Sequence, residues 1–224
     1  GIQVLLGFTP FGYDGVNQYS LENPELRAIG KDGQPVAPFG IGCWGYNLCP
    51  SRPESRRFML DYAREILARY PESDGLLIES SDYAICHCKD CGERYFENEF
   101  QFVKTISEET WARKPNATVI VFPHYFSGAQ VPGFGVKGAK FPFDARWSLV
   151  FTPHSSNPEP SLIKKARNSI WWDDSPALRR PRVIQDGARR AREIGATGYI
   201  PSLEAFTFVA TEAEEGQAWL KGKR

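Results

Sequence analysis

Short apolar runs recur along the chain, separated by longer polar or amphipathic stretches. Each run is uninterrupted rather than alternating, which is expected of strands that are buried on both faces. Turn residues such as Asp74 and Gly75 lead into the runs. The pattern predicts six strands, at residues 2–8, 76–78, 118–122, 147–151, 169–172 and 198–200.

The stretches between these runs carry helical signals. From residue 51 to residue 70, large apolar side chains recur every four positions and form one face. Ser51 and Glu54 have the spacing of a capping box, and Pro71 ends the helix. Further helices are predicted at residues 93–113, 162–167 and 181–195, the last closed by Gly195 as a left-handed C-cap.

Alternation of strands and helices predicts an α/β fold with a parallel sheet. An open doubly wound sheet fits this alternation, but neither a G-x-G-x-x-G motif nor a P-loop supports a nucleotide-binding version. A (β/α)8 TIM barrel is favoured because polar residues follow strand after strand, and a barrel gathers such positions around one mouth. These residues are Glu79, His124, His154, Asp173 and Glu204. Six strands rather than eight predict a fragment that lacks the first strands, with residues 1–224 forming one partial barrel domain.

Composition narrows the possible partners. Lys plus Arg and Asp plus Glu both number 27, so the net charge of zero offers no long-range attraction to nucleic acid or to an anionic membrane. No apolar run approaches the roughly 20 residues that span a bilayer. The N-terminal apolar run has no basic segment before it, so it is not expected to be a signal peptide. The compartment is expected to be cytoplasmic or exported, depending on whether a signal lies in a missing N-terminus.

Two carboxyl groups are candidates for catalysis. Glu79 directly follows a strand, and Glu204 also follows one. Glycoside hydrolysis needs two such groups, one to protonate the leaving oxygen and one to attack or to activate water. Ion pairs or backbone hydrogen bonds at the rim are the purely structural alternative. Asp82 is expected to orient Glu79, to bind a sugar hydroxyl or to begin a turn.

Histidines and aromatic residues near the strand ends are candidates for substrate binding. His124 and His154 each follow a strand and a proline, and could donate hydrogen bonds to sugar hydroxyls, bind backbone at the rim or ligate a metal. Aromatic residues make up 13% of the chain, and flat rings stack on the apolar faces of sugars. The residues expected to bind substrate are Asp82, Tyr83, Trp44, His124, Tyr125, His154, Trp172 and Asp173.

The cysteines form the most specific local pattern. Cys86, Cys88 and Cys91 make a C-x-C-x-x-C motif in the loop after Glu79, and Cys43 and Cys49 lie in the preceding loop. Three or four thiolates this close could hold a structural zinc ion, with His87 as a possible extra ligand. In an exported protein the same residues could form disulfides, and reduced thiols without a ligand are the third alternative.

The residues from 48 to about 110 resemble those of a group of bacterial barrel proteins related to β-N-acetylhexosaminidases and α-glucuronidases. The shared features are the helix start at Cys49 to Glu54, the strand that ends at Glu79, and the C-x-C-x-x-C motif. In this resemblance residues 2–8 correspond to the third strand of the barrel, so the strand before Glu79 corresponds to the fourth. The resemblance implies a carbohydrate-active barrel whose acid follows that fourth strand, at Glu79. The adjacent Asp-Glu pair of hexosaminidases is replaced by Glu79-Ser80-Ser81-Asp82, so the sugar is not implied.

These observations favour a glycoside hydrolase that acts on a carbohydrate, with Glu79 and Glu204 as catalytic carboxyls and no cofactor required for catalysis. One alternative is a metal-dependent hydrolase, lyase or isomerase whose ligands are Glu79, His124, His154 and Glu204. Another is a carbohydrate-binding barrel without catalytic activity.

Overall fold

The computed structural model describes residues 3–12, 16–37, 45–79, 85–122, 142–151, 166–173 and 181–201. The chain divides into two compact units, residues 1–143 and residues 144–224. All six predicted strands are present, with small differences at their ends. None of the helices in the described ranges is both long enough and apolar enough to cross a membrane.

The first unit contains three parallel strands, β1 (Leu5–Phe8), β2 (Gly75–Ile78) and β3 (Thr118–Val121), which pair in chain order. Leu6, Leu76 and Val119 share one row of the register. Leu76 and Val119 are fully buried, as the uninterrupted apolar runs predicted.

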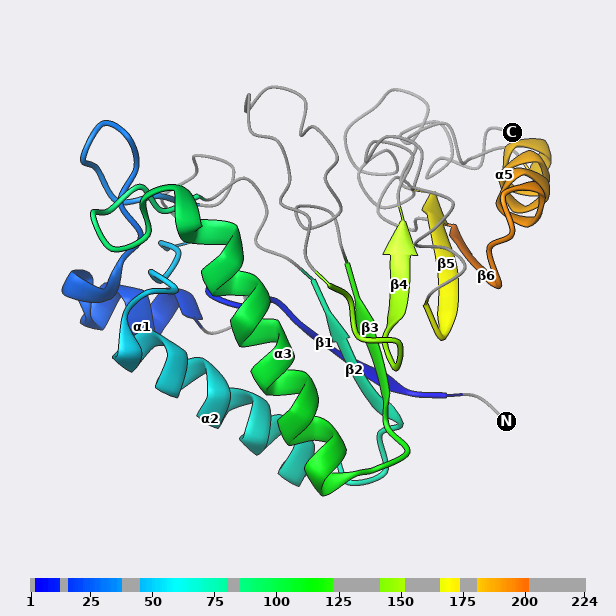
Figure 1. Ribbon diagram of the computed structural model, residues 1–224, viewed down its shortest axis with the longest axis horizontal. Coiled ribbons are helices and arrows are strands. Elements are labelled where there is room, and N and C mark those ends of the chain that lie inside the picture. The colour runs from blue at the N-terminus through cyan, green and yellow to red at the C-terminus, as the bar shows by residue number, and fades with distance from the viewer. Residues whose placement is uncertain are drawn as a thin grey trace, which may run out of the picture. The chain divides into compact units, whose positions relative to one another are not determined.

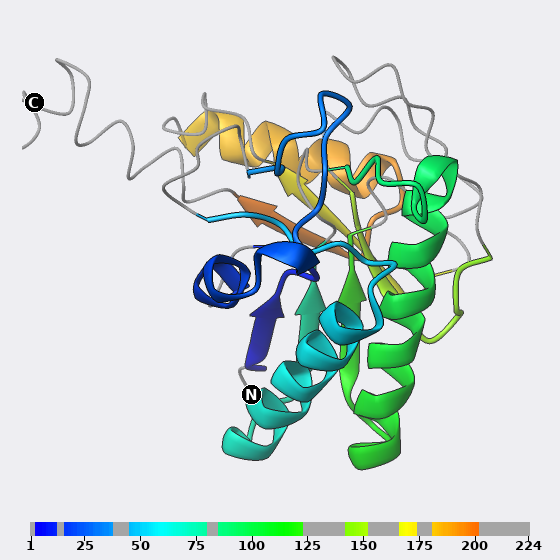
Figure 2. The same cartoon turned by 90° about the vertical axis from the view of Figure 1, so that its left-hand side faces the viewer.

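Helices α2 (Pro53–Arg69) and α3 (Tyr95–Arg113) lie side by side on one face of these strands (Figures 1 and 2). Helix α3 has the predicted apolar face. In α2 the buried residues are instead Ser55, Met59 and Ala63, and Tyr70, at the end of the predicted face, is exposed. Phe100, Val103 and Ile106 of α3 have no exposed surface, because residues three and four apart on a helix share one face. Shorter elements among the described residues of this unit are α1 (Val16–Glu22) and the 3-10 turns η1 (Pro24–Leu26) and η4 (Gly92–Arg94).

The capping box predicted at the start of α2 is wrong. Arg52 occupies the N-cap position and no side chain caps the helix, although Pro53 takes the first turn as expected. The Ser51 hydroxyl instead lies 3.1 Å from the sulfur of Cys49 and 3.0 Å from that of Cys91. A tertiary contact with sulfur has therefore replaced a local hydrogen bond to the backbone.

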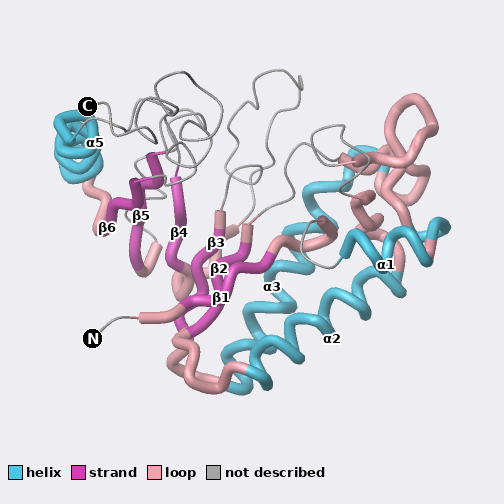
Figure 3. Tube along the Cα trace, turned by 180° about the vertical axis from the view of Figure 1, so that it is seen from behind, coloured by secondary structure: helices cyan, strands magenta, loops and turns pink. Residues whose placement is uncertain are grey.

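The second unit contains β4 (Ser148–Phe151), β5 (Asn168–Asp173), α5 (Pro181–Glu193) and β6 (Gly198–Pro201). The three strands described in this unit are also parallel and pair in chain order, and they lie side by side in Figure 3. Gly195 follows α5 with a φ of +85°, so the predicted left-handed C-cap is confirmed. The predicted helix at 162–167 falls almost wholly outside the described residues.

The prediction of a (β/α)8 TIM barrel is wrong, although the α/β class is right. Six strands are described, not eight, and the strand order is linear. β1 has β2 as its strand partner and β6 has β5, so no described pairing joins the first strand to the last. Alternation of strands and helices fixes the parallel direction of the strands, but closure depends on whether the two edge strands meet.

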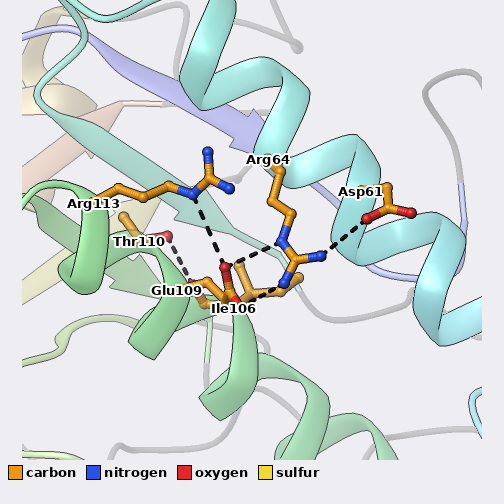
Figure 4. A network of polar contacts seen from close by, with 6 residues as sticks. All are labelled: Asp61, Arg64, Ile106, Glu109, Thr110 and Arg113. Atoms are coloured by element: carbon orange, nitrogen blue, oxygen red, sulfur yellow. Dashed lines mark hydrogen bonds and ion pairs between the residues drawn. The ribbon is translucent and has the colours of Figure 1, made fainter.

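Helices α2 and α3 are joined by an ion-pair network on their outer side (Figure 4). Both carboxylate oxygens of Glu109 on α3 accept hydrogen bonds from Arg64 on α2, at 2.7 and 3.1 Å. Asp61 and Arg113 extend the network at 3.0 and 4.0 Å. Hydrogen bonding to Arg64 lowers the pKa of Glu109 from its usual 4.5.

We expect Glu109→Gln to lower the stability of the protein at neutral pH. Because the pKa of Glu109 is depressed in the folded state, its contribution is complete above pH 4.5 and is lost as the pH falls through the lower folded value. Urea unfolding at a series of pH values should therefore show the two proteins converging in acid. Glu65→Gln is the matched control, since Glu65 pairs with Arg69 within one exposed helical turn and should matter less. A pH-independent difference between wild type and Glu109→Gln would contradict this expectation.

Candidate functional site

The carboxyl ends of β1, β2 and β3 form one edge, on which Phe8, Ile78 and Val121 are in register. Glu79 is the first residue after β2 and is half-buried. The backbone N–H of Phe122 donates to the carbonyl of Ile78 at 3.0 Å, so strand-like pairing continues to the last residue before Glu79. A carboxyl group therefore lies at the edge where parallel sheets of this kind place their functional residues.

The segment after β1 adds two features that the sequence did not indicate. Phe11 has a φ of +63°, which is uncommon for a residue with a side chain, and its buried ring lies 4.7 Å from that of Phe102. Its carbonyl accepts a hydrogen bond of 2.7 Å from Leu48. Asn47 is 1% exposed, and its side-chain amide has no hydrogen-bond partner within the described part of the chain. Strained backbone and unpaired buried amides are features that functional sites retain.

We expect Asn47→Leu, which keeps a similar shape, to raise the free energy of unfolding by about 1 kcal/mol. The reason is that a buried amide without a partner has lost its hydration and gained nothing in return. The shift should appear in the urea midpoint at an unchanged m value. A variant less stable than wild type would show instead that this amide is paired in the folded protein.

Four cysteines come together from the segments that follow β1 and β2. Cys49 lies in the segment between β1 and α2, whereas Cys86, Cys88 and Cys91 lie between β2 and α3. All four sulfur atoms lie within 4.8 Å of one another. The Cys49 sulfur is 3.6 Å from those of Cys86 and Cys88 and 3.5 Å from that of Cys91, and all four residues are free thiols. The predicted grouping of the C-x-C-x-x-C motif is therefore present, and Cys49 is a fourth member.

Crowding changes the acidity of these thiols. Hydrogen bonds from Cys86 and Cys91 hold the pKa of the Cys49 thiol well below its usual range. The same hydrogen bonding with Cys49 raises the pKa of Cys86 to about 12 and also raises that of Cys91. One thiolate is thus favoured at the expense of its neighbours, and a cation is needed before all four can ionise together.

A short backbone segment holds both cysteine-bearing loops. The N–H of Cys49 donates to the carbonyl of Leu26 at 2.8 Å, and the N–H of His87 donates to the carbonyl of Ile29 at 2.6 Å. The N–H of Ile29 in turn donates to the sulfur of Cys86 at 3.4 Å. Residues 26–29 therefore lie between the two loops and fix the sulfur atoms by their backbone.

Of the other residues predicted to act in catalysis or to bind substrate, the structure describes only Trp172 and Asp173. Trp172 is half-buried on β5 of the second unit, and Asp173 ends that strand. The remaining predictions lie outside the described residues: Trp44, Asp82, Tyr83, His124, Tyr125, His154 and Glu204. The sequence places Cys49 in the loop that precedes the C-x-C-x-x-C motif, but no spacing rule identifies it as a ligand.

No protein-family model matches the chain, and no curated protein matches it either. Among solved structures, a GH36 α-galactosidase from Geobacillus stearothermophilus in complex with 1-deoxygalactonojirimycin is similar at 10% identity and a TM-score of 0.46. That comparison covers 100% of this chain and 30% of that chain. An acarbose-soaked debranching enzyme from Nostoc punctiforme is similar at 14% identity and a TM-score of 0.41, over 89% of this chain and 51% of that one. These neighbours are glycoside hydrolases, but similarity at this level establishes neither a common fold nor a common activity.

Proposed function

We propose that this chain hydrolyses a glycosidic bond and that Glu79 is the carboxyl group that protonates the leaving oxygen. The observation that carries the proposal is the half-buried position of Glu79, directly after β2 on the edge formed by three registered parallel strands. The resemblance of residues 48–110 to carbohydrate-active proteins, and the 13% of aromatic residues, support a sugar as substrate.

The proposed reaction divides two roles between two carboxyl groups. Glu79, protonated, transfers its proton to the glycosidic oxygen as the bond to the anomeric carbon breaks. Glu204 acts as the second carboxylate, either attacking the anomeric carbon or activating the water that does so. A separation between the carboxyls of about 5 Å corresponds to retention of configuration, and one of about 6.5–9.5 Å to inversion.

Sugar binding is assigned, within the same proposal, to polar and aromatic residues near the strand ends. Flat rings would stack on pyranose faces, while carboxylates and imidazoles would bind hydroxyl groups. These residues are Trp44, Asp82, Tyr83, His124, Tyr125, His154, Trp172 and Asp173.

The test is a hydrolysis assay of the purified chain on a panel of nitrophenyl glycosides. The panel should include α- and β-galactosides, glucosides, glucuronides and N-acetylhexosaminides. Release of nitrophenol with at least one member supports the proposal, and NMR of the first-formed anomer then gives the stereochemical course. Absence of turnover across the panel, together with absence of reducing ends from polysaccharides, would contradict it.

A further inference from the structure

We propose that Cys49, Cys86, Cys88 and Cys91 bind one zinc ion as four thiolates, and that this ion joins the loop after β1 to the loop after β2. The proposal is independent of glycoside hydrolysis, because it rests on a different set of residues. It assigns the zinc a structural role, since four protein thiolates leave no coordination position for water or substrate.

The sulfur geometry fits a single tetrahedral ion. Zn–S bonds of about 2.3 Å at tetrahedral angles place neighbouring sulfurs about 3.8 Å apart. The distances from Cys49 to the other three sulfurs are 3.5–3.6 Å, and no two of the four sulfurs are farther apart than 4.8 Å. An iron–sulfur cluster is less suited to this spacing, because its iron atoms and inorganic sulfides stand between the thiolates and push them apart.

Burial and local backbone also fit a metal centre. Cys49, Cys86 and Cys91 are at most 1% exposed, and Cys88 is half-buried. A turn brings Cys88 and Cys91 to the same side, since the N–H groups of Cys91 and Gly92 both donate to the carbonyl of Cys88, at 3.1 and 2.8 Å. The turn therefore holds two of the ligands by backbone hydrogen bonds, which lowers the ordering cost of coordination.

Groups around the sulfurs are placed to support thiolates. The Ser51 hydroxyl lies 3.0–3.1 Å from two sulfurs and 3.8 Å from a third, so it can donate to a thiolate. The N–H of Ile29 donates to Cys86. Such outer hydrogen bonds orient metal ligands and tune their charge. They also explain why Ser51 contacts sulfur instead of capping α2.

The metal content of the purified full chain tests the proposal. We expect about one zinc ion per chain by mass spectrometry of metals, retained after dialysis against a chelator. Cys49→Ser should lose the zinc under the same dialysis. Two control variants should keep it: Cys43→Ser, a cysteine of the same loop outside the described residues, and Ser51→Ala, which removes a neighbouring hydroxyl but no ligand.

Wild-type protein supplies a second test that does not depend on whether Cys49→Ser folds. Cobalt-substituted protein should show intense visible absorption typical of tetrahedral coordination, with sulfur-to-cobalt charge transfer in the near ultraviolet. Zinc should leave the protein as a thiol-specific mercurial is added. Iron in place of zinc, loss of zinc from Cys43→Ser, or a zinc-free chain lighter by two hydrogens per disulfide would each overturn the proposal. Loss of activity in Glu79→Gln without loss of zinc would leave the zinc proposal intact, because that proposal does not involve Glu79.

Discussion

Glu79→Gln is expected to reduce kcat/KM on a nitrophenyl glycoside by about 10²- to 10⁴-fold, the usual contribution of a positioned proton donor. Glutamine has the same shape as glutamate but can neither release a proton nor carry a negative charge. The loss should shrink for a dinitrophenyl leaving group, because that anion departs without protonation. This dependence on the leaving group separates a proton donor from a nucleophile, whose removal would affect all substrates.

The fold of Glu79→Gln should be intact, because the side chain is half-buried and follows the last residue of β2. Urea unfolding and circular dichroism of the same preparation would confirm this. Glu72→Gln is the matched control, since Glu72 is exposed in the turn that precedes β2 and has no assigned role in hydrolysis. Equal activity of wild type and Glu79→Gln on every substrate would remove Glu79 from the mechanism.

Gly75→Ala is expected to destabilise the protein by about 3 kcal/mol or more, since overpacking and backbone strain each cost about 1–3 kcal/mol. Gly75 has a φ of +152°, which residues with side chains rarely adopt. A Cβ at this position would overlap the carbonyl oxygen of Thr118 and lie 2.8 Å from the carbonyl carbon and the amide nitrogen of that residue. Backbone of the neighbouring strand β3 cannot move aside without breaking its pairing with β2.

Because domains are stable by only about 5–15 kcal/mol, this change should give a large shift of the urea midpoint or loss of soluble protein. Gly7→Ala is the matched control on the adjacent strand β1. A Cβ at Gly7 meets no atom within 4 Å, so that variant should keep its stability or gain about 0.5 kcal/mol from a less flexible unfolded chain. Similar behaviour of the two variants would contradict the close approach at Gly75.

The secondary structure was predictable because its signals are local. Uninterrupted apolar runs marked β2 and β3, and the recurrence of large side chains marked the face of α3 that carries Phe100 and Ile106. The capping box at Ser51 failed because the hydroxyl lies against the sulfurs of Cys49 and Cys91, and the contact with Cys91, 40 positions away, cannot be read from spacing along the chain. The prediction of a closed barrel failed for a related reason, since closure depends on whether the two edge strands pair with each other.

The candidate site was predictable in part. The position of Glu79 at the end of a strand was predictable because an apolar run ends immediately before it, and the grouping of three cysteines was predictable because the motif itself brings them together. Cys49 is 37 positions before Cys86, and only the folded chain shows that its sulfur completes the group. The positive φ of Phe11 and the unpaired amide of Asn47 depend on tertiary packing, and their residue types carry no warning of either.

Residues 26–29 and the two loops that they join have little regular secondary structure, yet their amides are bonded as in a small sheet. Arg27 and Leu48 form an antiparallel bridge, and the N–H groups of Cys49 and His87 both bind this segment. Local opening there must break several buried hydrogen bonds at once, so these amides should exchange with solvent as slowly as those of a strand. Hydrogen exchange at these amides would therefore measure how rigidly residues 26–29 hold the two cysteine-bearing loops.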